Sequence, residues 1–345
     1  MPENISIEEA LAMEDAVFID VRSPGEFAED NLPGAINIPI LDDEQRCIVG
    51  TTYKQQGPNE ARVLGMDLVS AQIPEKIRKI QDVSKDKKII VYCWRGGLRS
   101  KAMSQLLDLA GIDSYRLLGG YKAYRKYIND YYINLEPINF LVLYGLTGVG
   151  KSEIIANLDK LGMETLDLEK LANHRGSVFG GVGLKNQPSQ KRFESSIYRI
   201  LQEYKNSKAI VVEGESRKVG KLIIPEVVYR SMQNGTKILV YNSIENRINR
   251  ILQEYLNGST ENLKGIERSI IQLQRRIGKS KTKDLLDKLW VGQYDEIVEE
   301  LLLNYYDPLY KHPESPSEVY DLSINAEDIE QAALQIKNYI ETQIL

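Results

Sequence analysis

Cysteine and histidine are both scarce in this sequence. Its 345 residues include two cysteines, Cys47 and Cys93, and two histidines, His174 and His312. Two cysteines cannot build a disulfide framework, and neither belongs to a Cys-x-x-Cys pair, so we expect a reducing compartment. Because thiol and imidazole ligands are so few, we expect no zinc site.

The chain also lacks a long apolar run, a signal-peptide pattern and a large excess of one charge. No segment approaches the ~20 apolar residues that cross a bilayer. The N-terminal stretch MPENISIEEALAMEDA is acidic and unlike a signal peptide. We therefore expect a cytoplasmic protein without a membrane partner. The net charge of −5 argues only weakly against nucleic acid, since the distribution of charge matters more than its sum.

Apolar runs of strand length alternate with helical patterns along most of the sequence. This alternation predicts an α/β fold class with largely parallel sheets, and the length of 345 residues predicts two domains. We place the first domain at residues 5–133 and the second at residues 139–345, with the boundary near Pro137. Residues 244–310, within the second domain, have a mainly helical pattern.

The stretch YCWRGGLRS, residues 92–100, holds the first candidate site. It follows the apolar run KKIIV, which predicts a buried strand, and precedes a segment with helical spacing. Two glycines allow the loop to curl around the Cys93 sulfur, while the helix N-terminus, Arg95 and Arg99 favour the thiolate. The same cradle suits a tetrahedral oxyanion. We predict that Cys93 is a nucleophile flanked by Arg95 and Arg99, rather than a packed structural cysteine.

Three other residues of the first domain receive structural interpretations. Asp20 and Arg22 stand at the end of a predicted strand, where we expect a structural ion pair rather than catalytic groups. Cys47 has no glycine-rich loop around it, so we expect a small packed side chain.

Three segments of this domain, FIDVRSPGEF, LPGAINIPI and VYCWRGGLRS, resemble a rhodanese domain. That fold carries sulfur or selenium on a cysteine. The sequence departs from the usual pattern in two places: Asp30 and Asn31 stand where a histidine is usual, and Arg99 lies six positions after Cys93. The resulting C-x5-R-S spacing is also typical of cysteine phosphatases, so the loop leaves chalcogen transfer and phosphate-ester hydrolysis both open.

The stretch GLTGVGKS, residues 145–152, matches the phosphate-binding motif G-x-x-x-x-G-K-[ST] between an apolar strand and a helix. In this motif glycine backbone N–H groups wrap a phosphate, the lysine reaches the terminal phosphate, and the hydroxyl can ligate Mg²⁺. Ser152 is therefore a candidate Mg²⁺ ligand, and we expect no tightly bound cofactor. The predicted phosphate-binding residues are Gly145, Gly148, Gly150, Lys151 and Ser152.

Residues 174–194 combine four glycines with several cations, which indicates a substrate loop rather than a plain connector. We expect His174, Arg175 and Arg192 to lie near a bound phosphate compound. Glu213 and Glu215 end a buried strand, where P-loop proteins often place an acid that holds Mg²⁺ directly or through water. The sequence leaves open which glutamate acts.

Residues 264–288 hold eight cations against three acids. A solvated helix face is the usual explanation of such a run. A surface for a nucleic-acid backbone is the alternative, because lysine and arginine supply the sequence-independent part of that affinity. The candidate contacts are Arg268, Arg275, Arg276 and Lys279.

A rhodanese-like α/β domain followed by a P-loop NTPase-like α/β domain with a helical C-terminal part resembles the bacterial tRNA 2-selenouridine synthases. The resemblance covers almost the full length. It rests on FIDVRSPGEF, DDEQRCIVGTTYKQQG, YCWRGGLRS, GLTGVGKS, HRGSVFGGVG, VEGESRKVG and RRIGKS in this order. It implies that geranyl diphosphate geranylates wobble 2-thiouridine in tRNA, and that selenium from selenophosphate then replaces the S-geranyl group.

The same resemblance assigns parts to the two sites. It implies that Cys93 carries selenium as an S-selanylcysteine and that the P-loop holds the diphosphate. It also implies tRNA with wobble 2-thiouridine as the macromolecular partner and a selenophosphate-supplying enzyme as a second one.

Two other function classes stay open on the residues alone. A rhodanese-fold cysteine phosphatase would use Cys93 and Arg99, and would turn over an aryl phosphate without tRNA. An ATP-dependent kinase or tRNA thiotransferase would couple nucleotide consumption to product. A pure binding module fits least well, because both motifs are reactive or phosphate-binding.

Overall fold

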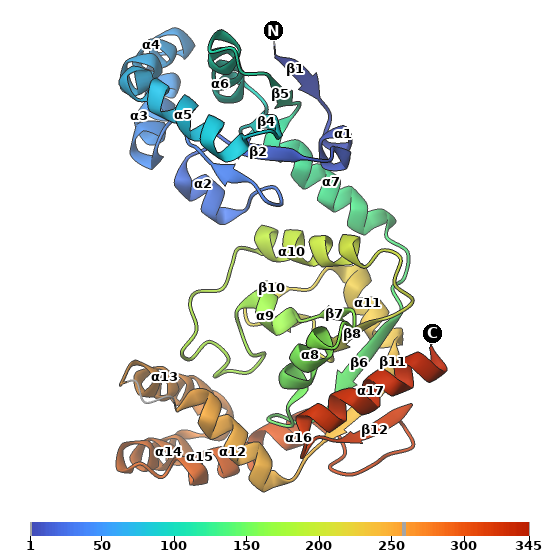
Figure 1. The fold of residues 1–345 in the computed structure, drawn as a ribbon. Helices are drawn as coiled ribbons and strands as arrows, with labels where there is room; N and C mark the ends of the chain where they lie inside the picture. Colours follow the sequence, from blue (N-terminus) through green and yellow to red (C-terminus); the bar gives the residue numbers. More distant parts are fainter. Residues whose placement is uncertain (1, 257–259, 345) are drawn as a thin grey trace. The chain divides into compact units, whose positions relative to one another are not determined.

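The computed structural model describes residues 2–256 and 260–344, which divide into two compact units (Figure 1). The units comprise residues 1–134 and 135–345. Each is built on a five-stranded sheet with helices around it. The predicted α/β fold class is therefore confirmed. None of the helices in the described residues has the length and apolar character to cross a membrane.

The sheet of the first unit has the strand order β1-β5-β4-β2-β3, and all of its pairs are parallel. Its strands are β1 (Glu3–Ile5), β2 (Ala16–Asp20), β3 (Ile36–Asn37), β4 (Lys88–Tyr92) and β5 (Ser114–Leu117). Its helices are α1 (Ile7–Ala12), α2 (Pro24–Glu29), α3 (Asp43–Gln55), α4 (Pro58–Val69), α5 (Ile73–Ser84), α6 (Leu98–Leu109) and α7 (Gly120–Asn134). The central strand β4 ends at the cysteine loop.

Alternate residues of the central strands divide the core of this unit between two faces. Val17, Ile19 and Val91 pack in one cluster with Met103 and Leu107 of α6. Their neighbours in sequence point to the opposite face of the sheet, as the period of two in a strand requires. A sheet buried on both faces explains why β2 and β4 are almost continuously apolar.

Two expectations for the first unit are wrong in detail. The helical spacing of ISIEEALAMED, residues 5–15, predicts a helix there, but Ile5 ends strand β1 and α1 covers only Ile7–Ala12. Three residues are too few for an alternating pattern, and Ser6 starts the helix with a capping box. Cys47 is exposed rather than packed, because α3 buries none of its residues.

The sheet of the second unit has the order β12-β11-β6-β8-β7, again parallel throughout. Its strands are β6 (Phe140–Tyr144), β7 (Thr165–Leu166), β8 (Ile210–Glu213), β11 (Thr236–Tyr241) and β12 (Leu322–Asn325). A separate hairpin joins β9 (Lys218–Val219) and β10 (Leu222–Ile223). The helices around the sheet are α8 (Lys151–Lys160), α9 (Leu168–Ala172), α10 (Gln190–Glu203), α11 (Glu226–Asn234) and α17 (Ile329–Gln343). One core cluster joins the sheet to α8 and α17.

A helical part interrupts this unit between β11 and β12, as the pattern of residues 244–310 predicts (Figure 1). It consists of α12 (Ile244–Tyr255), α13 (Thr260–Ile277), α14 (Lys279–Val291), α15 (Tyr294–Leu301), the π-turn η2 (Leu302–Tyr306) and α16 (Asp307–Tyr310). These helices share a second core, which also takes in Phe179 and Val182 from the glycine-rich loop. The loop is thereby anchored to the helical part.

Candidate functional site

Cys93 lies in the loop between the end of β4 and the start of α6, as the sequence predicts. The side chain is buried, with 3% of its surface exposed. Its Sγ is 3.3 Å from the Ser100 hydroxyl, which in turn lies 3.3 Å from the Gly97 carbonyl oxygen. A hydroxyl at this distance can donate to a thiolate. Ser100 therefore belongs to the site, although we did not predict it from the sequence.

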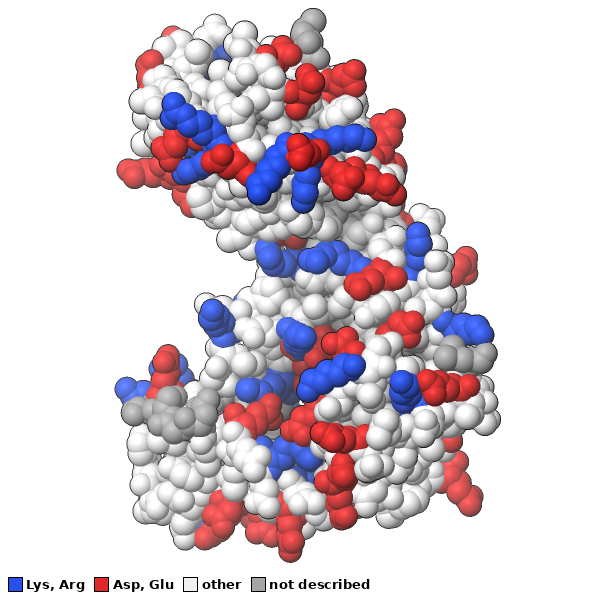
Figure 2. Space-filling view, in the orientation of Figure 1, with Lys and Arg blue, Asp and Glu red and all other residues white. Residues whose placement is uncertain are grey.

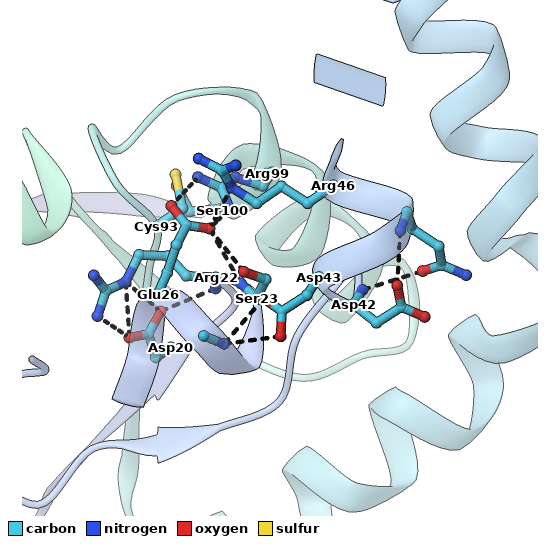
Figure 3. Close-up of polar contacts among 12 residues, drawn as sticks. Asp20, Arg22, Ser23, Glu26, Asp42, Asp43, Arg46, Cys93, Arg99 and Ser100 are labelled. Atoms are coloured by element: carbon cyan, nitrogen blue, oxygen red, sulfur yellow. Dashed lines mark hydrogen bonds and ion pairs between the residues drawn. The ribbon is translucent and has the colours of Figure 1, made fainter. Parts of the chain in front are cut away.

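Arg99 reaches across to a carboxylate on α2 (Figure 3). Its Nη1 donates to Glu26 Oε2 at 2.6 Å and its Nη2 to Oε1 at 3.3 Å, while Arg46 Nε lies 3.0 Å from the same Oε2. Partial burial opposes ionisation of Glu26, but Arg99, with Ser23 and Arg46, outweighs it and lowers the pKa of Glu26 to about 2. Two guanidinium groups are thus fixed beside the cysteine loop. Arg95, by contrast, is exposed to solvent.

The first residues of α7 contact the backbone of the cysteine loop. Gly120 has φ +56°, and a Cβ at this position would lie 2.1 Å from the Cys93 carbonyl oxygen. That approach allows the Tyr121 amide to donate to the Cys93 carbonyl at 2.8 Å. Only glycine fits such a position without strain.

Asp20 and Arg22 form the predicted ion pair, with 2.6 Å between Oδ2 and Nη2 and neither side chain exposed. The Arg22 guanidinium also lies 4.1 Å from the centre of the Tyr121 ring. This pair ties the end of β2 to the start of α7, which is a structural role.

The phosphate-binding motif occupies the loop between β6 and α8. A Cβ at Gly145, where φ is +153°, would lie 2.1 Å from the Val240 carbonyl oxygen, so the loop can pass β11 only with glycine here. Lys151 Nζ donates to the carbonyl oxygens of Gly145 and Leu146 at 2.9 and 3.2 Å. Its ammonium group is therefore held inside the loop.

Three glutamates stand beside this loop. Ser152 Oγ donates to Glu169 Oε2 at 2.7 Å, and the Glu169 amide donates to Glu213 Oε1 at 2.7 Å. Burial, reinforced by the charge of Glu215, raises the pKa of Glu169 to about 8. Sequence reasoning named Glu213 and Glu215 but missed Glu169, which lies in the first turn of α9, three residues after the short strand β7. The two acids close behind this strand, Asp167 and Glu169, were the signal that could have revealed it.

The oxygen atoms of Ser152 and Glu169 suit Mg²⁺, which prefers hydroxyl, carboxylate and phosphate oxygens. Among the described residues, no three side chains of His, Cys, Asp or Glu converge to hold a metal ion by themselves. A Mg²⁺ ion here would therefore depend on Ser152 and on the phosphate oxygens of a substrate. Protein residues would contribute only part of its coordination.

A cavity of about 210 Å³ opens from the phosphate-binding loop. All five predicted phosphate-binding residues line it, together with Glu169 and Glu215. The opposite wall is apolar and comes from the helical part, with Ile251, Ile266, Leu289, Ile297, Leu301 and Tyr306 among its residues. One cavity thus joins a phosphate site to an apolar pocket.

Helix α12 fixes the loop to the helical part. Arg247 Nε donates to the Thr147 carbonyl at 2.8 Å, and its Nη2 pairs with Asp307 Oδ1 at 2.6 Å. Arg250 Nη1 donates to the Gly148 carbonyl at 3.0 Å. Sequence reasoning missed both arginines, which lie about one hundred residues away from the motif in the chain.

The start of the segment 174–194 forms part of the cavity wall, through Arg175, Gly176, Ser177 and Phe179. Arg175 lines the cavity, forms an ion pair with Glu254 and lies 4.9 Å from the centre of the Tyr255 ring. Burial, together with the charge of Arg175, lowers the pKa of His174. Three residues that the sequence predicted near the phosphate compound, His174, Arg192 and Glu213, are not among the described residues that line this cavity. Arg192 is exposed on α10.

The basic run of residues 264–288 spans α13 and α14. Arg276 donates to the Tyr305 hydroxyl at 2.7 Å, Lys281 pairs with Glu300, and Lys288 lies 3.1 Å from Glu296. Acids of α15 therefore offset some of the charge of this run. The candidate contacts Arg268, Arg275, Arg276 and Lys279 are all exposed. Figure 2 shows acidic and basic side chains interspersed on the visible face of the second unit.

Comparison with known proteins covers both units. Residues 6–127 match the model of the rhodanese-like domain family, and residues 138–339 match the family described as tRNA 2-selenouridine synthase AAA domain. Among solved structures, a shikimate kinase from Bacteroides thetaiotaomicron is 16% identical with a TM-score of 0.27, over 59% of this chain and 98% of the kinase.

Two curated relatives carry the same name. A tRNA 2-selenouridine synthase from Pseudomonas syringae pv. syringae is 34% identical over 342 residues, covering 90% of this chain and 92% of that protein. One from Nitrosomonas europaea is 39% identical over 253 residues, which are 72% of this chain and 65% of that protein. Since the likeness extends through both units, and one family model alone spans most of the second, the chain belongs to the tRNA 2-selenouridine synthase family.

Proposed function

We propose that the protein converts wobble 2-thiouridine of tRNA into 2-selenouridine by geranylation followed by selenium transfer. The observation that carries the first step is the cavity in which the phosphate-binding loop meets an apolar wall. A prenyl diphosphate has the same division, with a charged head and a hydrocarbon tail. Family membership supports the overall conversion of the base.

The composition of the wall favours a prenyl group over a nucleoside. Beyond the phosphate loop the cavity is bounded largely by Ile, Leu, Val and Tyr side chains of the helical part. A hydrocarbon tail gains roughly 25 cal/mol for each Å² of apolar surface that it removes from water. Ribose and adenine would instead bring polar groups that lose hydrogen bonds against aliphatic side chains.

In the geranylation step, the sulfur of 2-thiouridine forms a bond to C1 of geranyl diphosphate. The C1–O bond breaks, its electron pair leaves on the diphosphate, and the N3 proton of the base passes to solvent. Lys151 offsets the charge that develops on the leaving group, and Mg²⁺ bound through Ser152 would do the same. The tRNA supplies the nucleophile, so no protein nucleophile is needed.

In the second step, selenium from selenophosphate bonds to C2 of the base and the C2–S bond breaks, with its electron pair on the departing geranylthiolate. The phosphoryl group passes to water. We assign Cys93 to this step, with Arg99 as the cation beside it. The Cys93 thiolate takes the phosphoryl group from selenium, the P–Se bond breaks with its electron pair on selenium, and water then hydrolyses the S–P bond, so selenium stays at the selenide level and no oxidant is needed. An enzyme that makes selenophosphate is the expected supplier. The two free cysteines fit the reducing cytoplasm as the setting.

The proposed tRNA surface includes the exposed cations Arg268, Arg275, Arg276 and Lys279 of α13 and α14. These side chains can offset phosphate charge without reading sequence. The identity of the modified base would then be selected at the cavity rather than along these helices.

The test of this function is mass spectrometry of nucleosides from 2-thiouridine tRNA incubated with the protein, geranyl diphosphate and selenophosphate. S-geranyl-2-thiouridine and 2-selenouridine are the expected products, and Lys151→Ala should depress the first. A requirement for ATP would support the thiotransferase alternative instead. Release of phosphate from an aryl phosphate without tRNA would support the phosphatase alternative.

A further inference from the structure

The apolar part of the cavity ends inside the core of the helical part. Leu289 of α14 is 2% exposed, Ile297 of α15 is 4% exposed and Ile266 of α13 is 8% exposed, and all three line the cavity. The same three side chains belong to the core cluster that holds these helices together. This end of the pocket is therefore bounded by packed core residues of the helices.

The lining residues differ in their distance from the phosphate loop. On α12, Arg250 donates to the Gly148 carbonyl, and a Cβ at Gly148 would lie 2.9 Å from Ile251 Cδ1. Helix α12 is therefore the near wall. It packs on α15, which packs on α14, and α14 packs on α13. Leu289, on a helix that is joined to α12 only through α15 in this series, consequently lies toward the end of the pocket away from the phosphates.

We infer that Leu289, backed by Ile266 and Ile297, forms the end wall of the prenyl site and sets the length of the chain that the protein accepts. This inference rests on the proposed function, since it gives the apolar pocket to the tail of a prenyl diphosphate. The diphosphate is fixed at Lys151 and Ser152, so the tail extends into the pocket from a fixed point. Its length then decides whether it meets the end wall.

A packed end wall disfavours prenyl tails that are too long and also tails that are too short. A tail that is too long must push buried side chains off their rotamers, which weakens its binding. A tail that is too short forgoes the burial of its missing carbon atoms, which weakens binding by about fourfold for each CH₂ group. Shortening Leu289 should therefore admit longer tails, and enlarging it should exclude them.

The experiment measures dissociation constants of the full-length protein for dimethylallyl, geranyl and farnesyl diphosphate by calorimetry, with inorganic pyrophosphate as the probe of the phosphate loop. Leu289→Ala should shift the ratio of farnesyl to geranyl affinity by about tenfold toward farnesyl. Leu289→Phe should weaken geranyl binding about tenfold while leaving dimethylallyl diphosphate bound. Pyrophosphate affinity should stay unchanged in both variants.

Leu285→Ala is the matched control. Leu285 lies on the same helix, is fully buried and belongs to the same core cluster, but it is not among the described residues that line the cavity. Its truncation should loosen the helical part to a similar degree without changing chain preference. Calorimetry against pyrophosphate would confirm that both variants remain folded at the loop.

The possible results separate the inference from the proposed function. If geranyl diphosphate binds more tightly than pyrophosphate, but Leu289→Ala and Leu285→Ala give the same length preference, the end wall lies elsewhere and the inference is wrong. If no prenyl tail improves on pyrophosphate in the unaltered protein, both the inference and the prenyl assignment fall. A shift confined to the Leu289 variants supports both.

Discussion

At the scale of single residues, the two cysteines make a natural pair for testing selenium delivery. Cys93 is buried beside Ser100 in the loop after β4, whereas Cys47 is exposed on α3. Serine keeps the size of cysteine but loses the polarizable thiolate. We expect Cys93→Ser to form S-geranyl-2-thiouridine and no 2-selenouridine, and Cys47→Ser to form both. Liquid chromatography with mass spectrometry of the nucleosides distinguishes the products.

Normal 2-selenouridine formation by Cys93→Ser would remove this cysteine from the mechanism. Because the side chain is buried, the variant also needs a check of folding. Trp94 lies in the first unit and Trp290 in the second, and they are the only tryptophans of the chain. In a Trp290→Phe background, fluorescence therefore reports unfolding of the first unit alone.

Glu26 predicts a dependence of stability on pH. Its pKa is lowered to about 2 in the folded protein, against about 4.3 for an ordinary glutamate. The stabilisation is therefore present above the ordinary value and is lost as the pH falls toward 2. At neutral pH, Glu26→Gln should lower the free energy of unfolding of the first unit by roughly 1–3 kcal/mol, and the difference from the unaltered protein should shrink between pH 4.5 and 2.

Urea unfolding followed through Trp94 would measure this difference at each pH. Glu75→Gln is the control, because Glu75 pairs with Lys79 on the exposed face of α5 and surface pairs contribute little. A difference for Glu26→Gln that stayed constant from pH 7 to pH 2 would contradict the role of the ionised carboxylate.

Which residues could be found from the sequence depends on how local their contacts are. Cys93, Arg99, Lys151 and Ser152 sit in short motifs whose spacing carries the chemistry, so they could be named. The partners that hold them could not: Glu26 is 73 residues away from Arg99 in the chain. Carboxylates this distant become visible only when the fold brings them together.

At the scale of elements, α12 and its buried arginine connect the phosphate loop to the helical part. Arg247 is 1% exposed, and its removal would leave the Asp307 carboxylate and the Thr147 carbonyl without this donor. Breaking such a buried pair costs about 3–5 kcal/mol. We expect Arg247→Met to lower the stability of the second unit by about this amount and to weaken pyrophosphate binding.

Urea unfolding followed through Trp290 in a Trp94→Phe background gives the stability, and calorimetry gives the affinity. Arg230→Met is the matched control, since Arg230 is 76% exposed and pairs with Glu226 on the surface of α11. It should change stability by less than about 1 kcal/mol. Equal effects of the two substitutions would contradict a special role for Arg247.

Helices α13 and α14 predict how tRNA affinity depends on salt. Reversing the charge of Arg275 and Arg276 should weaken binding to cognate and non-cognate tRNA alike, because contacts to the backbone are independent of sequence. The slope of the logarithm of affinity against the logarithm of salt concentration should fall by about 1–2. Filter binding across a salt series measures both quantities.

Reversal of Arg217 and Arg230 changes the net charge equally and serves as the control for that prediction. Both residues are exposed and pair with Glu226 in the same unit. If the control weakened binding as much as the double substitution on α13, the effect would be one of net charge and the tRNA surface would lie elsewhere.

Helices and strands could be predicted from the sequence where their runs of apolar or periodic residues were long. The apolar runs that became β4, β6 and β8 and the helical interval between β11 and β12 were evident in the sequence. The three-residue strand β1 and the hairpin of β9 and β10 were not, because two or three residues cannot display a period. The sequence predicted a packed side chain at Cys47, and that prediction failed for another reason. Whether a residue of α3 is buried depends on which other elements pack against this helix, and the composition of the helix does not show that.

At the scale of the whole molecule, both units place their candidate site at the same point of a parallel sheet. Each unit places a glycine-containing loop between the end of a central parallel strand and the start of a helix: β4 and α6 in one unit, β6 and α8 in the other. Ligands of open parallel sheets bind at this edge. One loop presents a thiol and the other presents an ammonium group and a hydroxyl, which suits two separate chemical steps on one substrate.

This separation predicts that two differently inactivated chains can complement each other. Lys151→Ala should fail at geranylation yet convert S-geranyl-2-thiouridine tRNA to the selenium product, whereas Cys93→Ser should do the reverse. Because the geranyl group of the proposed intermediate is joined to the base by a covalent C–S bond, a chain that lacks one step should be able to take up the product of a chain that lacks the other. A mixture of the two variants should therefore form 2-selenouridine from 2-thiouridine tRNA, at a rate that rises with protein concentration. The variant carrying both substitutions should form none, and mass spectrometry of the nucleosides measures the products of each variant and of the mixture.

If each variant performed its own half-reaction but the mixture made no 2-selenouridine, the intermediate would have to stay on one chain. Both steps would then have to occur on the same protein molecule.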